Sequence, residues 1–205
     1  MKKKGNLFVI CGPSGVGKGT VCKELLKRRP DIKLSISATT RKKRNGELEG
    51  VNYYFISKEN FQDMINKDEF WEYAEVYGNL YGTPKKYVLE HINNGEDVLL
   101  EIDIQGALQI KEKYPEGVFI FILPPSMKEL RNRIVNRGTD SKESIEKRLK
   151  AAFREIDFID KYDYYIINDK LENSISKLIS IIEAEKCRVK DDIYKLIQKY
   201  KEEAK

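Results

Sequence analysis

A glycine-rich segment near the amino terminus carries the residue types that bind phosphate. The segment runs Gly12-Pro13-Ser14-Gly15-Val16-Gly17-Lys18-Gly19-Thr20 and fits the pattern G-x-x-x-x-G-K of a phosphate-binding loop. Glycines let the backbone turn tightly and direct several N–H groups at one anion, and the lysine adds a full positive charge. The residue after the lysine is Gly19, so the hydroxyl that usually helps to hold Mg²⁺ is moved by one position, to Thr20.

The segments on either side are those that a phosphate-binding loop requires. The apolar residues 7–11 predict a buried strand before the loop, and residues 21–29 predict a helix after it. Such a helix points the positive end of its dipole at a bound anion. A glycine-rich turn that binds nothing is the alternative, but the lysine and both flanking elements lie where phosphate binding needs them.

A second group of polar side chains lies farther along the chain and has the chemistry to bind another phosphate and a base. Guanidinium groups and tyrosine hydroxyls match phosphate oxygens well, although a basic run alone is usually a solvated loop. A carboxylate accepts two hydrogen bonds side by side, which is what the N1–H and N2–H₂ edge of guanine offers. The group consists of Arg41, Arg44, Tyr53, Glu72, Tyr81 and Thr83.

Segments that favour strands and helices alternate along most of the chain, which predicts an α/β protein built on a parallel sheet. The unbroken apolar residues 118–123 are typical of a strand that is buried on both faces. Residues 35–95 differ, because they are rich in aromatic residues and mixed β patterns. We therefore expect a core of residues 1–34 and 96–205 and an insertion of residues 35–95.

Local capping signals predict several boundaries. Ser57 and Ser126 precede helical segments and are typical N-cap residues. Thr83, followed by a proline, predicts the N-cap of a helix that Gly95 ends. Residues 34–38 predict one short strand.

The composition narrows the class of protein and its location. The 205 residues carry a formal charge of +5, which suits an anionic partner such as a nucleotide, a nucleic acid or a phosphopeptide. Three widely spaced cysteines predict neither a disulfide framework nor a zinc site and favour a reducing compartment. The first residues lack the apolar stretch of a secretory signal, and no apolar run is long enough to span a membrane. We expect a cytoplasmic protein that does not bind membranes.

The chain resembles the guanylate kinase family, which belongs to the nucleoside-monophosphate kinase group of P-loop proteins. Beside the phosphate-binding loop, further motifs carry the resemblance in order over nearly the whole chain. The helix predicted after about Lys186 lies outside them and receives no catalytic role. These motifs are Thr39-Thr40-Arg41-x-x-Arg44-x-x-Glu47-x-x-Gly50-x-x-Tyr53-x-Phe55-Ile56, Gly78-Asn79-x-Tyr81-Gly82-Thr83, Asp103-Ile104-Gln105-Gly106, Pro124-Pro125-Ser126 and Arg137-Gly138-Thr139.

The resemblance implies transfer of the γ-phosphoryl group of ATP to GMP, giving ADP and GDP, with Mg²⁺ as cofactor. It implies a parallel-sheet P-loop kinase core, a mixed-β GMP-binding insertion and a helical lid at about residues 126–150. The activity would belong to purine nucleotide metabolism, where it recycles GMP and dGMP.

The resemblance also assigns site residues. Residues 12–20 are implied to bind the phosphates of ATP, and Asn168 is implied to meet its adenine. The residues implied to contact guanine are Ser37, Glu72, Thr83 and Asp103. Those implied to hold the GMP phosphate are Arg41, Arg44, Tyr53 and Tyr81. The implied lid arginines are Arg133, Arg137 and Arg148.

The chemistry of such a transfer explains why the chain needs no general base. The attacking atom is a phosphate oxygen that is mostly ionised at neutral pH, because its second pKa is about 6. Catalysis then comes from alignment and from cations that meet developing charge, which Lys18 and the lid arginines would supply. His91, the single histidine, lies in a predicted helix and is expected at the surface.

Gly19 leaves the protein ligands of Mg²⁺ open. This ion prefers to keep water and phosphate oxygens, so much of its shell need not come from the protein. Glu101 and Asp103 are candidates for its outer shell.

Three other functions are less consistent with the sequence. A guanylate-kinase-like scaffold domain that binds phosphopeptides without catalysis tends to lose the loop glycines and lysine, which this chain retains. A nucleic-acid-binding module would explain the charge, but Tyr53, Trp71 and Tyr77 alternate with apolar neighbours and are expected to pack in a core or pocket. A kinase for another monophosphate is the closest rival, and Glu72 argues against it.

Overall fold

Two β-sheets form the framework of the protein, which a computed structural model describes for residues 4–76, 78–136, 142–189 and 193–204. The first sheet has five parallel strands in the order β2-β7-β1-β8-β9. The second has four strands in the order β4-β3-β6-β5 and mixes parallel and antiparallel pairs. The strands are β1 (Leu7–Cys11), β2 (Lys33–Leu34), β3 (Ala38–Thr39), β4 (Tyr54–Phe55), β5 (Phe70–Val76), β6 (Asn79–Pro84), β7 (Val98–Glu101), β8 (Val118–Leu123) and β9 (Tyr164–Ile167).

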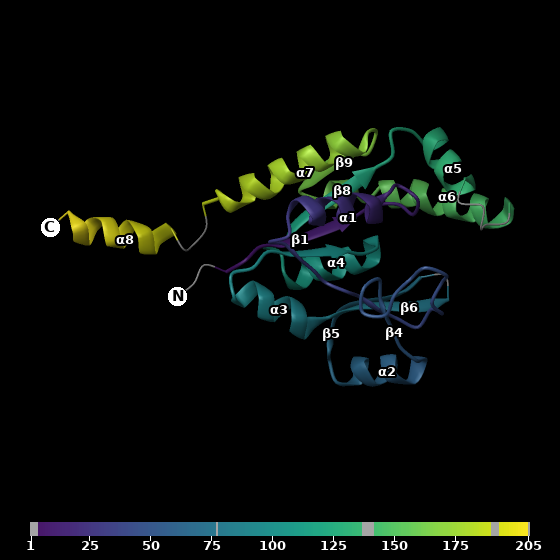
Figure 1. Ribbon diagram of the computed structural model, residues 1–205, viewed down its shortest axis with the longest axis horizontal. Helices are drawn as coiled ribbons and strands as arrows, with labels where there is room; N and C mark the ends of the chain where they lie inside the picture. Colours follow the sequence, from purple (N-terminus) through teal and green to yellow (C-terminus); the bar gives the residue numbers. More distant parts are fainter. Residues whose placement is uncertain (1–3, 77, 137–141, 190–192, 205) are drawn as a thin grey trace.

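Helices cover both faces of the first sheet (Figure 1). None of the described helices is long and apolar enough to cross a bilayer. They are α1 (Lys18–Arg28), α2 (Lys58–Asn66), α3 (Lys85–Asn93), α4 (Ile104–Lys113), α5 (Met127–Val135), α6 (Lys142–Ile156), α7 (Leu171–Lys186) and α8 (Ile193–Glu203), with a 3₁₀ turn at Ile159–Lys161.

Strand β1 shows why the first sheet is a core, because all five of its residues are buried. Its side chains alternate between the two faces, as the period of a strand requires. Phe8 and Ile10 pack with residues of α1, α5 and α7, whereas Leu7 and Val9 pack with residues of α3 and α4. The predicted α/β protein with a parallel sheet is confirmed.

The second sheet has its own small core and is fastened to the first through α4. Phe61 of α2 stacks on Phe70 of β5, with ring centroids 4.4 Å apart. On the other side of β5, Trp71 is buried against the core of the first sheet and meets the ring of Tyr114 edge-on at 5.2 Å. Helix α3 lies within residues 35–95, yet its Val88 packs on the first sheet, so the predicted domain division stays a prediction.

The strand predicted at residues 34–38 is wrong as a single element. It is split between the two sheets: β2 pairs with β7, and β3 pairs with β4 and β6. The Ser35 N–H donates to the Leu99 carbonyl at 3.0 Å, and the Ser37 carbonyl accepts from the Tyr54 N–H at 2.9 Å. The backbone therefore changes sheets at Ile36.

The capping predictions had mixed outcomes. The hydroxyls of Ser57 and Ser126 each accept a backbone N–H three residues on, at 3.1 Å, and Gly95 follows the end of α3 with φ of +85°. The N-cap at Thr83 is wrong, because β6 continues to Pro84 and Pro84 itself precedes α3. The Thr83 hydroxyl is instead used inside the candidate site described next.

Candidate active site

A cleft of about 1080 Å³ lies between the two sheets and α6. Its lining comes from four parts of the chain: the loop after β1, side chains of the second sheet and its connections, residues 101–104 at the end of β7 and beyond it, and α6. The carboxyl ends of β1 and β7 both open into it, which is where ligands bind in open α/β sheets.

The loop at the end of β1 has the geometry that its glycines predicted. Gly12, Gly15 and Gly17 all have positive φ, at +144°, +93° and +98°. A β-carbon at Gly12 would lie 2.3 Å from the carbonyl oxygen of Ile122, so the backbones of the loop and β8 approach too closely for any side chain. The loop is thus shaped by glycine at positions where other residues would be strained.

Lys18, the first residue of α1, closes the loop on itself. Its Nζ donates to the carbonyl oxygens of Gly12 at 2.5 Å and Pro13 at 3.2 Å, and the residue lines the cleft. An ammonium group bound to neutral carbonyls keeps its positive charge, which can attract an anion in the cleft.

Asn168 and Arg133 support the loop from outside the cleft. The Asn168 amide donates to the Val16 carbonyl at 2.8 Å and accepts from the Ser174 hydroxyl at 2.9 Å. Arg133 donates to the carbonyls of Val16 at 3.1 Å and Asn168 at 3.0 Å, and to Glu129 at 3.0 Å. Neither residue is part of the described cleft lining. Their visible role is to hold the loop, which the sequence interpretation as adenine contact and lid arginine did not foresee.

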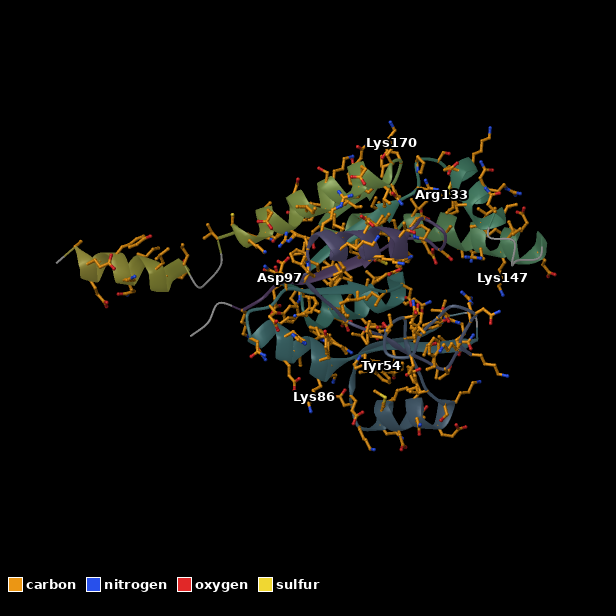
Figure 2. The ribbon with its side chains drawn as sticks, viewed as in Figure 1. Tyr54, Lys86, Asp97, Arg133, Lys147 and Lys170 are labelled. Atoms are coloured by element: carbon orange, nitrogen blue, oxygen red, sulfur yellow. The ribbon has the colours of Figure 1, made fainter. Side chains whose placement is uncertain are left out.

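Helix α6 contacts the loop at Ser14. The Arg148 guanidinium donates to the Ser14 hydroxyl at 2.8 Å, and the Glu155 carboxylate lies near the Ser14 backbone N–H, which lowers the pKa of that carboxyl. Burial raises the pKa of Glu155, with the charge of Lys18 opposing that rise. Lys147 also lines the cleft, from the side of α6 that faces the second sheet, and Figure 2 labels it with Arg133. Arg137, the third predicted lid arginine, lies outside the described residues.

The opposite end of the cleft holds a buried carboxylate. Glu72 of β5 is 3% exposed and accepts from the Thr83 hydroxyl at 2.6 Å. Burial raises the pKa of Glu72 to about 7, and the charge of Asp103 adds to that rise, whereas the Thr83 hydrogen bond lowers it. Glu72, Asp103 and Ser37 line the cleft, and Thr83 lies behind Glu72.

Asp103 is fixed by the helix that follows it. Its carboxylate is the N-cap of α4 and accepts from the Gly106 N–H at 3.0 Å. The Glu72 carboxylate lies against the same glycine, since a β-carbon on Gly106 would be 2.4 Å from Glu72 Oε2.

Between the two ends lies a cluster of arginine and tyrosine side chains. Arg41 forms a two-pronged ion pair with Glu47, at 2.8 and 3.0 Å, and its Nε donates to the Tyr81 hydroxyl at 3.2 Å. Glu47 also accepts the N–H of Arg44 at 2.8 Å. Burial raises the pKa of Tyr53 to about 12, so its hydroxyl keeps its proton and can donate to an anion.

The remaining predicted site residues differ in whether they line the cleft. Arg44, Tyr53 and Tyr81 line the cleft, whereas Arg41 lies behind them in its pair with Glu47. Thr20 is exposed on α1 and is outside the described lining. In the loop itself, Val16 and Pro13 are buried, and neither is part of the described lining.

The carboxylates near the loop bear on metal binding. Within the described part of the chain, no group of three or more His, Cys, Asp or Glu side chains is arranged to hold a metal ion. Glu101 lies beside Gly19, with Oε1 3.4 Å from where a β-carbon on that glycine would be. Burial raises the pKa of Glu101, and the charge of Lys18 opposes it.

Sequence reasoning missed the roles of Glu47, Glu155 and Gly106. Glu47 and Gly106 stood in the recognised motifs but had no local signal for a partner. Glu155 lies in an ordinary amphipathic helix, and only the packing of α6 against the loop brings it to Ser14.

The chain is similar to known proteins in sequence and in structure. A family model described as guanylate kinase matches residues 4–185. A guanylate kinase of Clostridioides difficile (strain 630) is 58% identical over 201 residues, 98% of each chain. A guanylate kinase of Caldanaerobacter subterraneus subsp. tengcongensis is 59% identical over 189 residues, 92% of each chain. The crystal structure of guanylate kinase from Anaplasma phagocytophilum matches with a TM-score of 0.78 and 37% identity, covering 92% of this chain and 90% of that one.

Proposed function

Because the chain belongs to the guanylate kinase family, we propose that it transfers the γ-phosphoryl group of ATP to GMP, giving ADP and GDP. The family makes it a nucleoside monophosphate kinase and a P-loop transferase. No comparison favours a phosphopeptide-binding scaffold, and the loop glycines and Lys18 are all present. We expect the activity in purine nucleotide metabolism in the cytoplasm.

One observation carries the proposal: a single cleft has a phosphate-binding loop at one end and a buried carboxylate at the other. The loop suits a nucleoside triphosphate, because its N–H groups and Lys18 offer a concentrated positive potential. Glu72 retains acceptor positions beyond the one that Thr83 uses, since an ionised carboxylate can accept about four hydrogen bonds. Guanine presents two adjacent donors to such a group.

The cluster between the two ends fits the phosphate of GMP. Arg44, Tyr53 and Tyr81 would donate to its oxygens from the cleft wall. Arg41 would join them through its contact with Tyr81. Ser37, Thr83 and Asp103 complete the guanine end, Thr83 by holding Glu72 in place.

We propose that Mg²⁺ arrives with ATP. The described carboxylates form no metal-binding cluster, so phosphate oxygens and water would make up most of the ion's ligands, as Mg²⁺ prefers. Glu101, beside Gly19, would orient a water of that shell. The ion would neutralise charge on the phosphates.

The residues of the chain would then act by alignment. An ionised GMP oxygen attacks without a general base, and Lys18 and Arg148 stabilise charge that develops during transfer. Arg133 would act indirectly, by fixing the loop through Val16. The contacts of α6 with Ser14 place Arg148 at the loop, where it also limits the access of water.

The experiment is to mix the protein with ATP, Mg²⁺ and each nucleoside monophosphate in turn and to follow ADP. GMP should be the preferred acceptor, IMP intermediate because it lacks N2, and AMP poor by a factor on the order of 10⁴. Glu72→Gln should lower turnover of GMP and narrow the gap to IMP. Turnover of AMP or CMP equal to the turnover of GMP would contradict the proposal.

A further inference from the structure

Gly106 lies where α4 meets β5, directly against Glu72. A β-carbon at this position would be 2.4 Å from Glu72 Oε2 and 2.8 Å from its carboxyl carbon, distances that real β-carbons do not reach. Any residue other than glycine would therefore displace the carboxylate.

The conformation of Gly106 does not itself require glycine. It lies within α4 and is not among the described glycines with positive φ. A glycine inside a helix is less favourable than alanine. The space that glycine leaves for the Glu72 carboxylate is a structural reason for glycine at this position.

Hydrogen bonds between α4 and β5 oppose a separation that would relieve such a contact. The Gln109 amide donates to the Tyr73 carbonyl at 2.9 Å, and Lys113 donates to the Trp71 carbonyl at 2.8 Å. These bonds fasten β5 to α4 on both sides of Glu72. With Oε1 held by Thr83 at 2.6 Å, the part left to move is the carboxylate itself.

The backbone of Gly106 serves the second acid of the same end of the cleft. Its N–H donates to Asp103 Oδ1 at 3.0 Å and so orients that carboxylate. One residue thus touches both acids, through its N–H on one side and through its missing side chain on the other.

We propose that Gly106 is a positioning residue for base recognition, which sets the place of Glu72 and the direction of Asp103. The inference rests on the proposed function, because it deepens the account of how guanine is read. Gly106 itself touches no reacting atom.

The test is Gly106→Ala, which keeps the N–H to Asp103 and adds only the β-carbon. KM for GMP should rise about tenfold or more, and the preference for GMP over IMP should narrow, because Glu72 no longer meets N1–H and N2–H₂ together. KM for ATP should change less than about threefold, and far-UV circular dichroism should show that the variant is folded, since alanine itself favours the helix.

A double-mutant cycle with Glu72→Ala provides the matched control. With the carboxylate removed, adding Gly106→Ala should have no further effect on GMP, because the two changes share one mechanism. Additive losses, equal weakening of ATP and GMP, or an unchanged KM for GMP would each overturn the role of Gly106. The wild-type protein is assayed in the same series, and its failure to phosphorylate GMP would overturn the proposed function instead.

Discussion

The two ends of the cleft prepare for a ligand in opposite ways. At the loop end, recognition groups belong to nine consecutive residues, and their supports, such as Asn168 and Arg133, are already bonded to the loop. At the other end, the groups come from segments between residues 37 and 106 and are partly bonded to one another. The loop end is held by supports outside the cleft, whereas under the proposed function the guanine and phosphate end would exchange internal partners for those of the ligand.

The pair between Arg41 and Glu47 shows what this exchange involves. Glu47 occupies both prongs of a guanidinium that is mostly buried. A phosphate that binds Arg41 directly must displace this carboxylate or share the guanidinium with it. The affinity for GMP is therefore a difference between two charge-assisted contacts, whereas at the loop end Lys18 has the neutral carbonyls of Gly12 and Pro13 as internal partners.

The largest expected effect is the fall in kcat when Lys18 of the loop is replaced. Lys18→Ala should lower kcat by more than about 100-fold, because one charge-assisted contact is worth roughly 1.5–3 kcal/mol and more where charge develops. A coupled ADP assay measures the rate, and far-UV circular dichroism checks the fold. Turnover close to wild type in a folded Lys18→Ala protein would refute the role of the loop.

A second, smaller effect should distinguish the binding of GMP at one end of the cleft from the binding of ATP at the other. Arg44→Ala should weaken GMP by about 10- to 150-fold and leave ATP nearly unchanged, since the residue lies away from the loop. Arg41→Ala should also weaken GMP but destabilise the fold as well, because it leaves Glu47 without its partner. Calorimetry with each nucleotide and a urea titration would detect both; equal losses for ATP would instead indicate a general electrostatic patch.

The affinity for GMP should depend on pH through Glu72. Burial and Asp103 raise the pKa of Glu72 to about 7, opposed by Thr83 and Lys113, and guanine needs the ionised form. GMP affinity should therefore fall by up to about tenfold per pH unit below that pKa. The Glu72→Gln protein controls for titration of the GMP phosphate itself and should lack this component. Parallel profiles of the two proteins between pH 5.5 and 8 would contradict the role of Glu72.

The same shift predicts the pH dependence of stability. Unfolded Glu72 loses its proton near its usual pKa of 4.5, but the folded form keeps it up to about 7. The unfolded state therefore binds fewer protons between these values, and this residue lowers the free energy of unfolding as pH rises through that window. Urea unfolding should show Glu72→Gln gaining stability over wild type from pH 4.5 to 7 and no further above it.

The smallest effect should come from Thr20. This residue is exposed and outside the described cleft lining, so Thr20→Val should change KM for ATP by less than about tenfold, the worth of one neutral hydrogen bond. Initial rates at varied ATP and Mg²⁺ would measure it. A loss as large as that of Lys18→Ala would mean that the Thr20 hydroxyl replaces the one missing at Gly19.

The contrast between the two ends also explains what the sequence could predict. The loop and the parallel sheet depend on local patterns: glycines at positive φ and apolar runs such as residues 118–123. The split of residues 34–38 could not be read, because a change of partner strand leaves the local pattern unaltered. Thr83 before a proline fits an N-cap, but its hydroxyl serves Glu72, eleven residues away in the chain.

Local patterns also failed to predict the roles that residues play through contacts with distant parts of the chain. The resemblance grouped Ser37, Glu72 and Asp103, and all three line one cleft, yet spacing alone would not have grouped them. It gave no hint that Asn168 braces the loop, because that depends on β9 and α7 lying beside it. Assignments carried by local backbone chemistry were predictable, and those made by tertiary contact were not.

The change of sheets at Ile36 limits how far the cleft can open. Ser35 is bonded to the first sheet and Ser37 to the second, so a single residue lies between them. Peptide bonds are planar and leave two soft dihedral angles per residue. Between the Ser35 N–H and the Ser37 carbonyl lie only the φ and ψ angles of these two serines and of Ile36. On this side of the molecule, a rotation of one sheet against the other that keeps both hydrogen bonds is confined to the dihedral angles of three residues, and those of Ile36 are the most restricted because its side chain is β-branched.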